Sequence, residues 1–167
     1  MTEGNDNVQL IERFYGAFAD RDGEAMAACY SSDVQFSDPV FPDLRGDRAG
    51  NMWRMLTEQG RDLQIELLEH DAEGDAGSAH WRATYTFTAT GRKVVNDVKA
   101  TLRFADGRIA EHHDDFDFHR WARQALGPMG LLLGWTPIVK GSVRKKAAER
   151  LEEYSAKRGS GETQPAA

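Results

Sequence analysis

Two short stretches of this 167-residue sequence place ionisable side chains where strand alternation favours apolar ones. In residues 34–38 the even positions are apolar until Asp38, and in residues 110–118 they are apolar except for His112 and Asp114. A buried carboxylate is costly unless it is paired or hydrogen-bonded, and groups of perturbed pKa are typical of acid–base sites. We therefore identify Asp38, His112 and Asp114 as candidate catalytic residues.

The chemistry that these groups favour is proton transfer. His112 and Asp114 are two positions apart, so their side chains are neighbours about 6 to 7 Å apart along one strand face. An imidazole exchanges protons near neutral pH, and a neighbouring carboxylate tunes it. Asp38 is expected to be the general base, with the His112–Asp114 pair as acid/base partner or polarising group.

Each candidate also has a purely structural interpretation. An aspartate before proline, as at Asp38, is a common turn element whose carboxylate accepts backbone amides. The His112–Asp114 pair could simply satisfy itself inside the core. A shift of one residue in register would turn His113, Asp115 and Asp117 inward instead, although the apolar even positions oppose it. Because a strand sends alternate side chains to opposite faces, this run forms no compact metal site, and no metal is expected.

Composition sets further bounds. A chain of this length with 40% hydrophobic residues is most economically one domain with a sizeable core. Its net charge of −6 argues against nucleic acid as a partner, and its lone cysteine, Cys29, fits a reducing compartment. The first seven residues show no signal-peptide pattern, and no apolar run reaches the roughly 20 residues of a membrane span. We expect a cytoplasmic, soluble protein without stable membrane insertion.

The elements that must position the candidates are helices followed by strands. Apolar spacing predicts helices over 8–20, 23–30 and 47–58, with a strand ending at Asp38 between the last two. Period-two alternation then predicts strands over 63–67, 81–89, 96–104 and 108–118, joined by hairpin turns. This order predicts an α+β domain in which the helices cover one face of a mostly antiparallel sheet.

The last third of the chain has a different pattern. Residues 119–126 and 142–157 are predicted helices, separated by turns and by the apolar segment 131–137. This apolar segment is expected to dock over the open end of the sheet as a lid, across a dimer, or outside the helices as a belt. The basic run 144–146 beside it suggests a membrane surface or, more commonly, a solvated helix face. The expected divisions are 1–7 disordered, 8–118 domain, 119–157 helical extension and 158–167 disordered tail.

Over residues 8–118 the sequence resembles the nuclear transport factor 2-like superfamily, in its SnoaL-like and ketosteroid isomerase-like branch. The resemblance rests on Arg13-Phe14, Asp20-Arg21-Asp22, Tyr30-Ser31-Ser32-Asp33, Phe36-Ser37-Asp38-Pro39-Val40, Leu44-Arg45-Gly46 and Gly107-Arg108-Ile109-Ala110-Glu111. It implies a cone-shaped fold in which a curved sheet and three N-terminal helices enclose a deep apolar pocket. Members of this superfold catalyse several reactions, and some catalyse none.

By this resemblance, Asp38 falls where the general base of the ketosteroid isomerases lies, in the same Asp-Pro-Val context. The tyrosine and the protonated aspartate of their oxyanion hole correspond to Phe14 and Ala100, so steroid isomerisation by that mechanism is not expected. Polyketide cyclases of the SnoaL type use an aspartate and a histidine without metal or cofactor, and His112 and Asp114 are similar in kind.

Limonene-epoxide hydrolase-like enzymes rely on an arginine between two aspartates. Here Arg82 and Arg103 fall on the polar faces of their strands, which argues against that chemistry.

The function expected is therefore that of a cofactor-independent enzyme acting by proton transfer on a hydrophobic carbonyl compound, as an isomerase, cyclase or dehydratase. The alternative is a non-catalytic module for small-ligand binding or dimerisation. A homodimer is expected through the polar sheet face that carries Thr84, Thr86 and Thr88. The substrate pocket is predicted to be lined by Phe14, Tyr15, Phe18, Trp53, Tyr85, Phe87 and Asn96.

Overall fold

The computed structural model describes residues 3–161, which form an α+β fold. The helices are α1 (Glu3–Ala19), α2 (Gly23–Ala28), α3 (Asp47–Gln59), α4 (Phe118–Leu126), α5 (Pro128–Leu133) and α6 (Pro137–Gly159). The strands are β1 (Tyr30–Ser37), β2 (Leu44–Arg45), β3 (Gln64–Glu73), β4 (Ala76–Phe87), β5 (Arg92–Ala105) and β6 (Arg108–Asp115). The expected fold class is confirmed.

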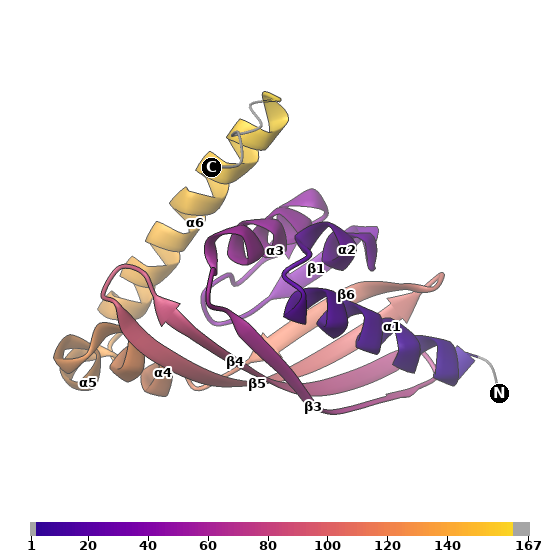
Figure 1. Ribbon diagram of the computed structural model, residues 1–167, viewed down its shortest axis with the longest axis horizontal. Coiled ribbons are helices and arrows are strands. Elements are labelled where there is room, and N and C mark those ends of the chain that lie inside the picture. Colours follow the sequence, from indigo (N-terminus) through magenta and orange to yellow (C-terminus); the bar gives the residue numbers. More distant parts are fainter. Residues whose placement is uncertain (1–2, 162–167) are drawn as a thin grey trace.

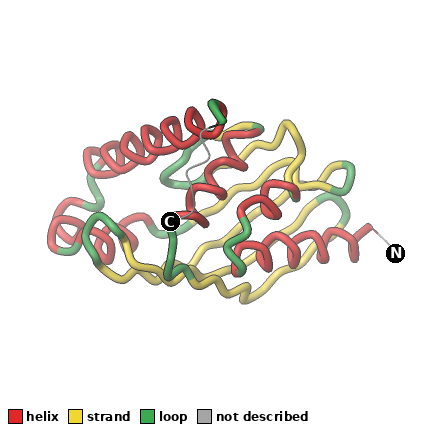
Figure 2. Tube along the Cα trace, turned by 45° about the horizontal axis from the view of Figure 1, so that its top comes forward, coloured by secondary structure: helices red, strands yellow, loops and turns green. Residues whose placement is uncertain are grey.

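The six strands form one curved, unclosed sheet in the order β2-β1-β6-β5-β4-β3. All neighbouring strands are antiparallel except β1 and β6, which run parallel. Helices α1, α2 and α3 lie together over one face of the sheet, as Figures 1 and 2 show. The main core fills the space between these helices and that inner face.

The β5–β6 hairpin decides which side chains enter the core. Asp106 and Gly107 have φ values of 50° and 74°, as a two-residue hairpin turn requires. The register then shifts between Arg103 and Phe104, so β6 contains a bulge near Ala110. Ile109 therefore faces inward although its number is odd, while the even positions point inward again from His112.

The extension after β6 differs in part from the sequence-based prediction. Asp117 caps α4, whose buried face packs on β5 and beside the side chains of Tyr85 and Phe87. The segment predicted as an apolar loop contains the short helix α5. Helix α6 begins at Pro137, with Thr136 as N-cap, and not at Ser142. Proline is favoured at the first helical position because its missing N–H has no partner there.

Helix α6 runs against α3 and closes over the core. Leu151 is fully buried, the Asn51 amide donates to the Ser155 hydroxyl at 3.2 Å, and the Tyr154 hydroxyl donates to Glu58 at 2.7 Å. The stretch from Met129 to Ile138, in contrast, leaves its large apolar side chains exposed. The expectation that this segment docks on its own chain is therefore wrong, because α4 packs on β5 and α6 packs on α3, while the segment between them stays exposed.

At the other end, α1 begins at Glu3, earlier than the predicted start at residue 8. Acidic residues near a helix N-terminus stabilise it, and the Asn7 amide donates to the Gly74 carbonyl at 2.9 Å. Within residues 3–161, no helix combines the length and apolar character that crossing a membrane requires.

Candidate active site

Four side chains form a buried chain of hydrogen bonds across the inner face of the sheet. The Trp53 indole N–H donates to the Tyr30 hydroxyl at 2.7 Å, and that hydroxyl lies 2.8 Å from Nδ1 of His112. Nε2 of His112 lies 2.8 Å from Oδ1 of Asp114. His112 and Asp114 are each 1% exposed, so the sequence-based prediction that both face the core agrees with their placement.

Strand register explains why these groups meet. His112 pairs with Phe36 of β1 on one side and with Leu102 of β5 on the other, at the middle of the sheet. Tyr30 opens β1, pairs with Ile109 of β6, and is buried on the inner face. Trp53 reaches the same point from α3, whose buried face lies above β1. The site therefore depends on two strands and one helix that are far apart in the sequence.

The direction of the hydrogen bonds follows from the donor at one end. An indole can only donate, so the Tyr30 oxygen accepts there, and its own proton is left available for Nδ1 of His112. Nε2 of His112 then carries a proton that Asp114 accepts. With these directions, each polar group of the chain has a hydrogen-bond partner.

Aromatic rings surround this imidazole and keep water away. The ring centroids of Phe14, Phe36 and Trp53 lie 5.5, 5.1 and 6.0 Å from that of His112, and Trp53 stacks on it at an interplanar angle of 22°. Phe18 packs edge-on against Trp53 at 5.0 Å. In such an apolar setting, charge-assisted hydrogen bonds are stronger than in water.

Asp38 lies just beyond the end of β1 and is half-buried. Its Oδ1 accepts the backbone amides of Val40 and Phe41 at 2.7 and 2.5 Å, which is the turn arrangement expected of Asp-Pro. Burial raises the pKa of Asp38 from 3.8 to about 7, against the lowering effect of the Phe41 amide and with a further rise from Asp114. Asp38 therefore caps a turn and also has a pKa near neutrality.

Two buried polar groups beside this network have no hydrogen-bond partner among the described residues. They are the Tyr15 hydroxyl and the Trp81 indole N–H, whose rings lie 5.8 Å apart. Burial, and next the charge of Asp114, raises the pKa of Tyr15 well above its usual value, so the hydroxyl keeps its proton. An unpaired buried donor costs about 1 to 3 kcal/mol, and such donors often mark the place of a ligand or water.

The predicted pocket residues fall into two groups. Phe14, Tyr15, Phe18 and Trp53 are buried around the imidazole. The other three, Tyr85, Phe87 and Asn96, are half-buried; Tyr85 accepts the Trp121 indole N–H at 2.8 Å, and Phe87 packs on Trp121 at 5.5 Å. The sequence-based list therefore contains two neighbouring sets of residues, of which the first surrounds His112.

Placement decides between the two strand registers that the sequence allowed for β6. The odd positions 113 and 115 of β6 are exposed, and Asp117 caps α4, so the shifted register does not occur. Arg82 pairs with Asp97 at 2.8 Å, and Arg103 pairs with Asp75 at 3.1 Å, both away from the core. No three His, Cys, Asp or Glu side chains of residues 3–161 are grouped to hold a metal ion.

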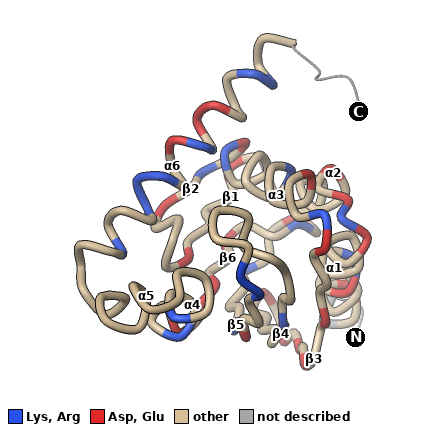
Figure 3. Tube along the Cα trace, turned by 60° about the vertical axis from the view of Figure 1, so that its left-hand side comes forward, with Lys and Arg blue, Asp and Glu red and all other residues tan. Residues whose placement is uncertain are grey.

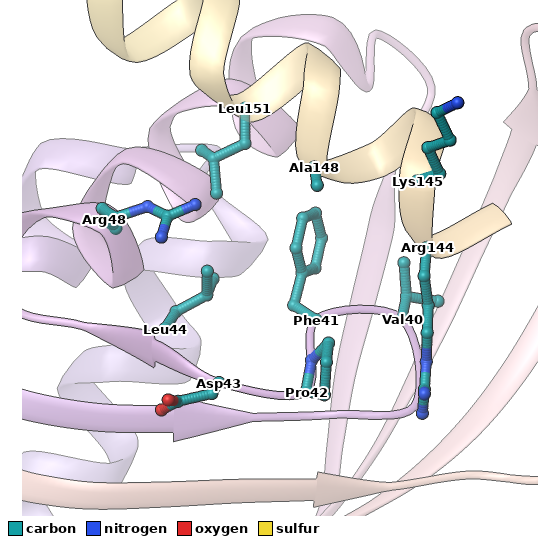
Figure 4. Close-up of a pocket in the computed structure, with 10 residues that line it drawn as sticks. All are labelled: Val40, Phe41, Pro42, Asp43, Leu44, Arg48, Arg144, Lys145, Ala148 and Leu151. Carbon is teal, nitrogen blue, oxygen red and sulfur yellow. The ribbon is translucent and has the colours of Figure 1, made fainter. Parts of the chain in front are cut away.

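A pocket of about 330 Å³ lies next to the turn that holds Asp38, between that turn and α6 (Figure 4). Phe41 points into it toward Ala148, and the Arg48 side chain approaches from α3. A second hollow of about 220 Å³ lies on the outer face of the sheet, near His80 and Asp97. Neither of these two is lined by Asp38, His112 or Asp114, so neither is a cavity that joins the three candidate catalytic residues.

Sequence reasoning missed Tyr30 and Trp81. Both are inward residues of their strands, and Trp81 was counted only as part of an alternating pattern. Parity alone could have marked Tyr30 as inward, since it matches Val34 and Phe36. Its contact with His112, however, depends on the parallel pairing of β1 with β6, which a single sequence does not reveal.

Comparisons with known proteins agree with this architecture. Residues 11–112 match the model of the SnoaL-like domain. No curated protein matches the chain by sequence.

Among solved structures, an LEH-like epoxide hydrolase from M. tuberculosis is similar, with 23% identity, a TM-score of 0.61, and coverage of 82% of this chain and 97% of that one. A putative SnoaL-like polyketide cyclase from Jannaschia sp. CCS1 has 16% identity, a TM-score of 0.67, and coverage of 77% and 96%. A putative ketosteroid isomerase from Kribbella flavida has 21% identity, a TM-score of 0.55, and coverage of 70% and 82%.

At these identities the solved structures establish the fold and not the reaction. The family match, which covers more than half of the chain, goes further. It includes β1, α3 and β6 as far as His112, which are the elements that assemble the buried hydrogen-bond chain. The chain therefore belongs to the SnoaL-like domain family.

Proposed function

We propose that this protein is a cofactor-independent enzyme that acts by proton transfer on a hydrophobic, carbonyl-containing small molecule, as an isomerase, cyclase or dehydratase. The observation that carries the proposal is a carboxyl group of pKa about 7, Asp38, within electrostatic reach of the buried His112–Asp114 pair. Proton transfer is most efficient when the catalytic pKa lies near the working pH.

In this proposal Asp38 is the general base. Its ionised form removes a proton from the carbon next to the substrate carbonyl. The electron pair of that C–H bond forms the C=C bond of an enolate, and the π pair of the C=O bond moves onto the carbonyl oxygen. Tyr15 and Trp81 are the donors for this oxygen, since both are buried and unpaired among residues 3–161. The His112–Asp114 pair delivers or accepts the second proton, at the other reacting atom.

The burial of the network limits the direction of approach. The side chain of His112 is 0% exposed and that of Asp114 is 2% exposed, whereas Asp38 is half-buried at the end of β1. A substrate therefore first meets Asp38 and must part aromatic side chains to reach the imidazole. An apolar, aromatic surrounding favours a flat hydrophobic substrate with few polar atoms.

Hydrogen–deuterium exchange into a simple ketone tests the proposal. The protein is incubated in D₂O with 2-tetralone and a panel of cyclic and aryl ketones, and deuterium at the carbon next to the carbonyl is measured by NMR. We expect exchange above the buffer rate, with Asp38→Asn slower by about 10² to 10⁴ and binding nearly unchanged. Asp33→Asn, an exposed aspartate of the same strand, is the matched control. Equal rates for Asp38→Asn and wild type would rule out Asp38 as the base.

A non-catalytic ligand-binding module is the second candidate, and one observation favours it. Both ring nitrogens of His112 already have partners, as expected of an imidazole whose role is to hold the inner face together. Under this alternative the ketones bind but no deuterium enters them, and His112→Gln lowers stability without changing any rate.

A further inference from the structure

The end of the molecule formed by α5 and the start of α6 exposes an unusual number of large apolar side chains. Trp135 is 72% exposed and Ile138 is 82% exposed. Isolated exposed apolar residues are ordinary, but a contiguous group marks an interaction surface. We call this group the α5 patch; its members are Met129, Leu131, Leu132, Leu133, Trp135 and Ile138.

The exposure of the α5 patch is built into the packing of α5 against α4. A Cβ atom on Gly130 would lie 1.9 Å from the Ala122 carbonyl oxygen, and one on Gly134 would lie 2.9 Å from the Ala122 Cβ. These glycines let the two backbones touch, which turns the side chains between them away from the body. The Trp135 indole N–H donates to the Leu132 carbonyl at 3.0 Å, so the ring is held while its face stays open.

The charge around the α5 patch differs from that of the rest of the chain. Residues 118–148 contain six Lys and Arg and no Asp or Glu, which leaves 15 basic and 27 acidic residues elsewhere in the sequence. The basic residues of this stretch belong to α4 and to the first turns of α6, and acidic residues return only further along α6 (Figure 3). Lys145 and Lys146 are exposed there. The stretch that carries the α5 patch, residues 118–148, therefore contains basic residues and no acidic ones, in a chain whose net charge is negative.

We propose that the α5 patch docks this protein onto an anionic lipid bilayer. Its Leu and Trp side chains would sit at the boundary between headgroups and acyl chains, while the cations of α4 and α6 meet the phosphates. Apolar residues including Trp, flanked by Lys and Arg, are the features of interfacial membrane binding. This inference does not depend on the proposed catalytic function.

A second copy of the chain fits the α5 patch less well. A twofold contact through this surface would bring residues 118–148 against the same residues of the partner. Six basic side chains would then face six others, with no acidic side chain in either stretch. Like charges brought together without partners oppose association, whereas lipid phosphates neutralise them.

The tryptophans supply a specific reporter of docking. Trp53, Trp81 and Trp121 are buried at 2, 6 and 6% exposure, so a change in polarity at the surface acts mainly on Trp135. Vesicles of phosphatidylcholine with about 30% phosphatidylglycerol should shift the tryptophan emission of the intact protein to the blue. In flotation assays the protein should rise with these vesicles. Trp135→Phe should keep the flotation and lose the shift.

Paired variants separate the apolar and the charged contributions. Leu132→Ser with Ile138→Ser should weaken vesicle binding at least about tenfold, because two exposed anchors are lost. Lys145→Gln with Lys146→Gln should weaken it about 25-fold at low salt, about fivefold for each charge. Lys99→Gln with Lys157→Gln, two exposed lysines outside this stretch, is the control and should stay within about twofold.

Circular dichroism and urea midpoints confirm that each variant is folded before it is compared. Absence of flotation with the anionic vesicles, or unchanged flotation of the Leu132→Ser, Ile138→Ser variant, would overturn the proposal. A dimer that this variant dissociates, together with no vesicle binding, would assign the α5 patch to a second copy instead. Equal binding to pure phosphatidylcholine and to the anionic vesicles would show that the Lys and Arg side chains do not contribute, and would overturn the proposed preference for an anionic bilayer.

Discussion

Replacing Asp38 by asparagine should stabilise the protein at neutral pH while removing its proposed base. The raised pKa, about 7 in the folded state against 3.8, means that the folded protein holds a proton that the unfolded chain has already lost. Stability therefore falls as the pH rises from about 4 to about 7, and this loss is complete above that window. Asparagine cannot ionise, and its oxygen can still accept the Val40 and Phe41 amides.

The size of the effect follows from the shift. A difference of about three pKa units corresponds to about 4 kcal/mol, and solvent reaching the half-buried carboxyl reduces this to about 2 to 4 kcal/mol. Urea unfolding at pH 8 should show Asp38→Asn more stable than wild type by that amount. At pH 4 the two proteins should differ by less than about 1 kcal/mol, since the folded carboxyl is then protonated and the unfolded one is near the midpoint of its titration.

Taking the difference between variant and wild type at each pH cancels the titration of the groups that do not interact with Asp38. Asp33→Asn, on an exposed position of β1, serves as the control and should show no comparable gap between the two pH values. The reasoning that burial raises the pKa of Asp38 would be refuted if the gain in unfolding free energy of Asp38→Asn over wild type were equal at pH 4 and pH 8, or larger at pH 4.

Three further outcomes are expected. Tyr30→Phe leaves the Trp53 N–H and His112 Nδ1 unpaired in the core and should cost about 2 to 4 kcal/mol in urea unfolding, whereas Tyr154→Phe, at a half-buried position, should cost less than about 1; equal costs would contradict the buried network. Tyr15→Phe should leave stability unchanged or raise it, because the hydroxyl has no partner among residues 3–161, and should weaken ketone binding; a clear loss of stability would show that it is satisfied. Light scattering should give about twice 18.7 kDa if the polar sheet face forms the predicted homodimer, and a monomer would mean that this face is solvated.

Strand parity was enough to place His112 and Asp114, because β6 keeps strict alternation from position 112 onward. It failed two residues earlier, where the bulge turns Ile109 inward and makes Ala110 only partly buried. Bulges depend on the partner strand, so one sequence does not locate them. The same limit hid the Tyr30–His112 contact, which rests on parallel pairing between segments 82 residues apart.

Asp38 could be read in two ways from its sequence, as a turn residue or as a base with an altered pKa, and the structure combines them. One carboxylate oxygen caps the turn, while burial and Asp114 raise the pKa. The C-terminal extension was harder to predict. The pair Thr136-Pro137 is a good helix start, yet the rule that apolar segments are buried pointed to a docked loop. That rule is statistical, and the α5 patch departs from it.

The most direct test of the central claim is the titration of Asp38 itself, followed by NMR of its side-chain carboxyl carbon. We expect a pKa of about 7 in the wild-type protein, and a lower pKa in Asp114→Asn because the charge of Asp114 raises it. An Asp38 carboxyl that titrates near its ordinary value of 3.8, unchanged by Asp114→Asn, would contradict the assignment of this residue as a base for neutral-pH proton transfer.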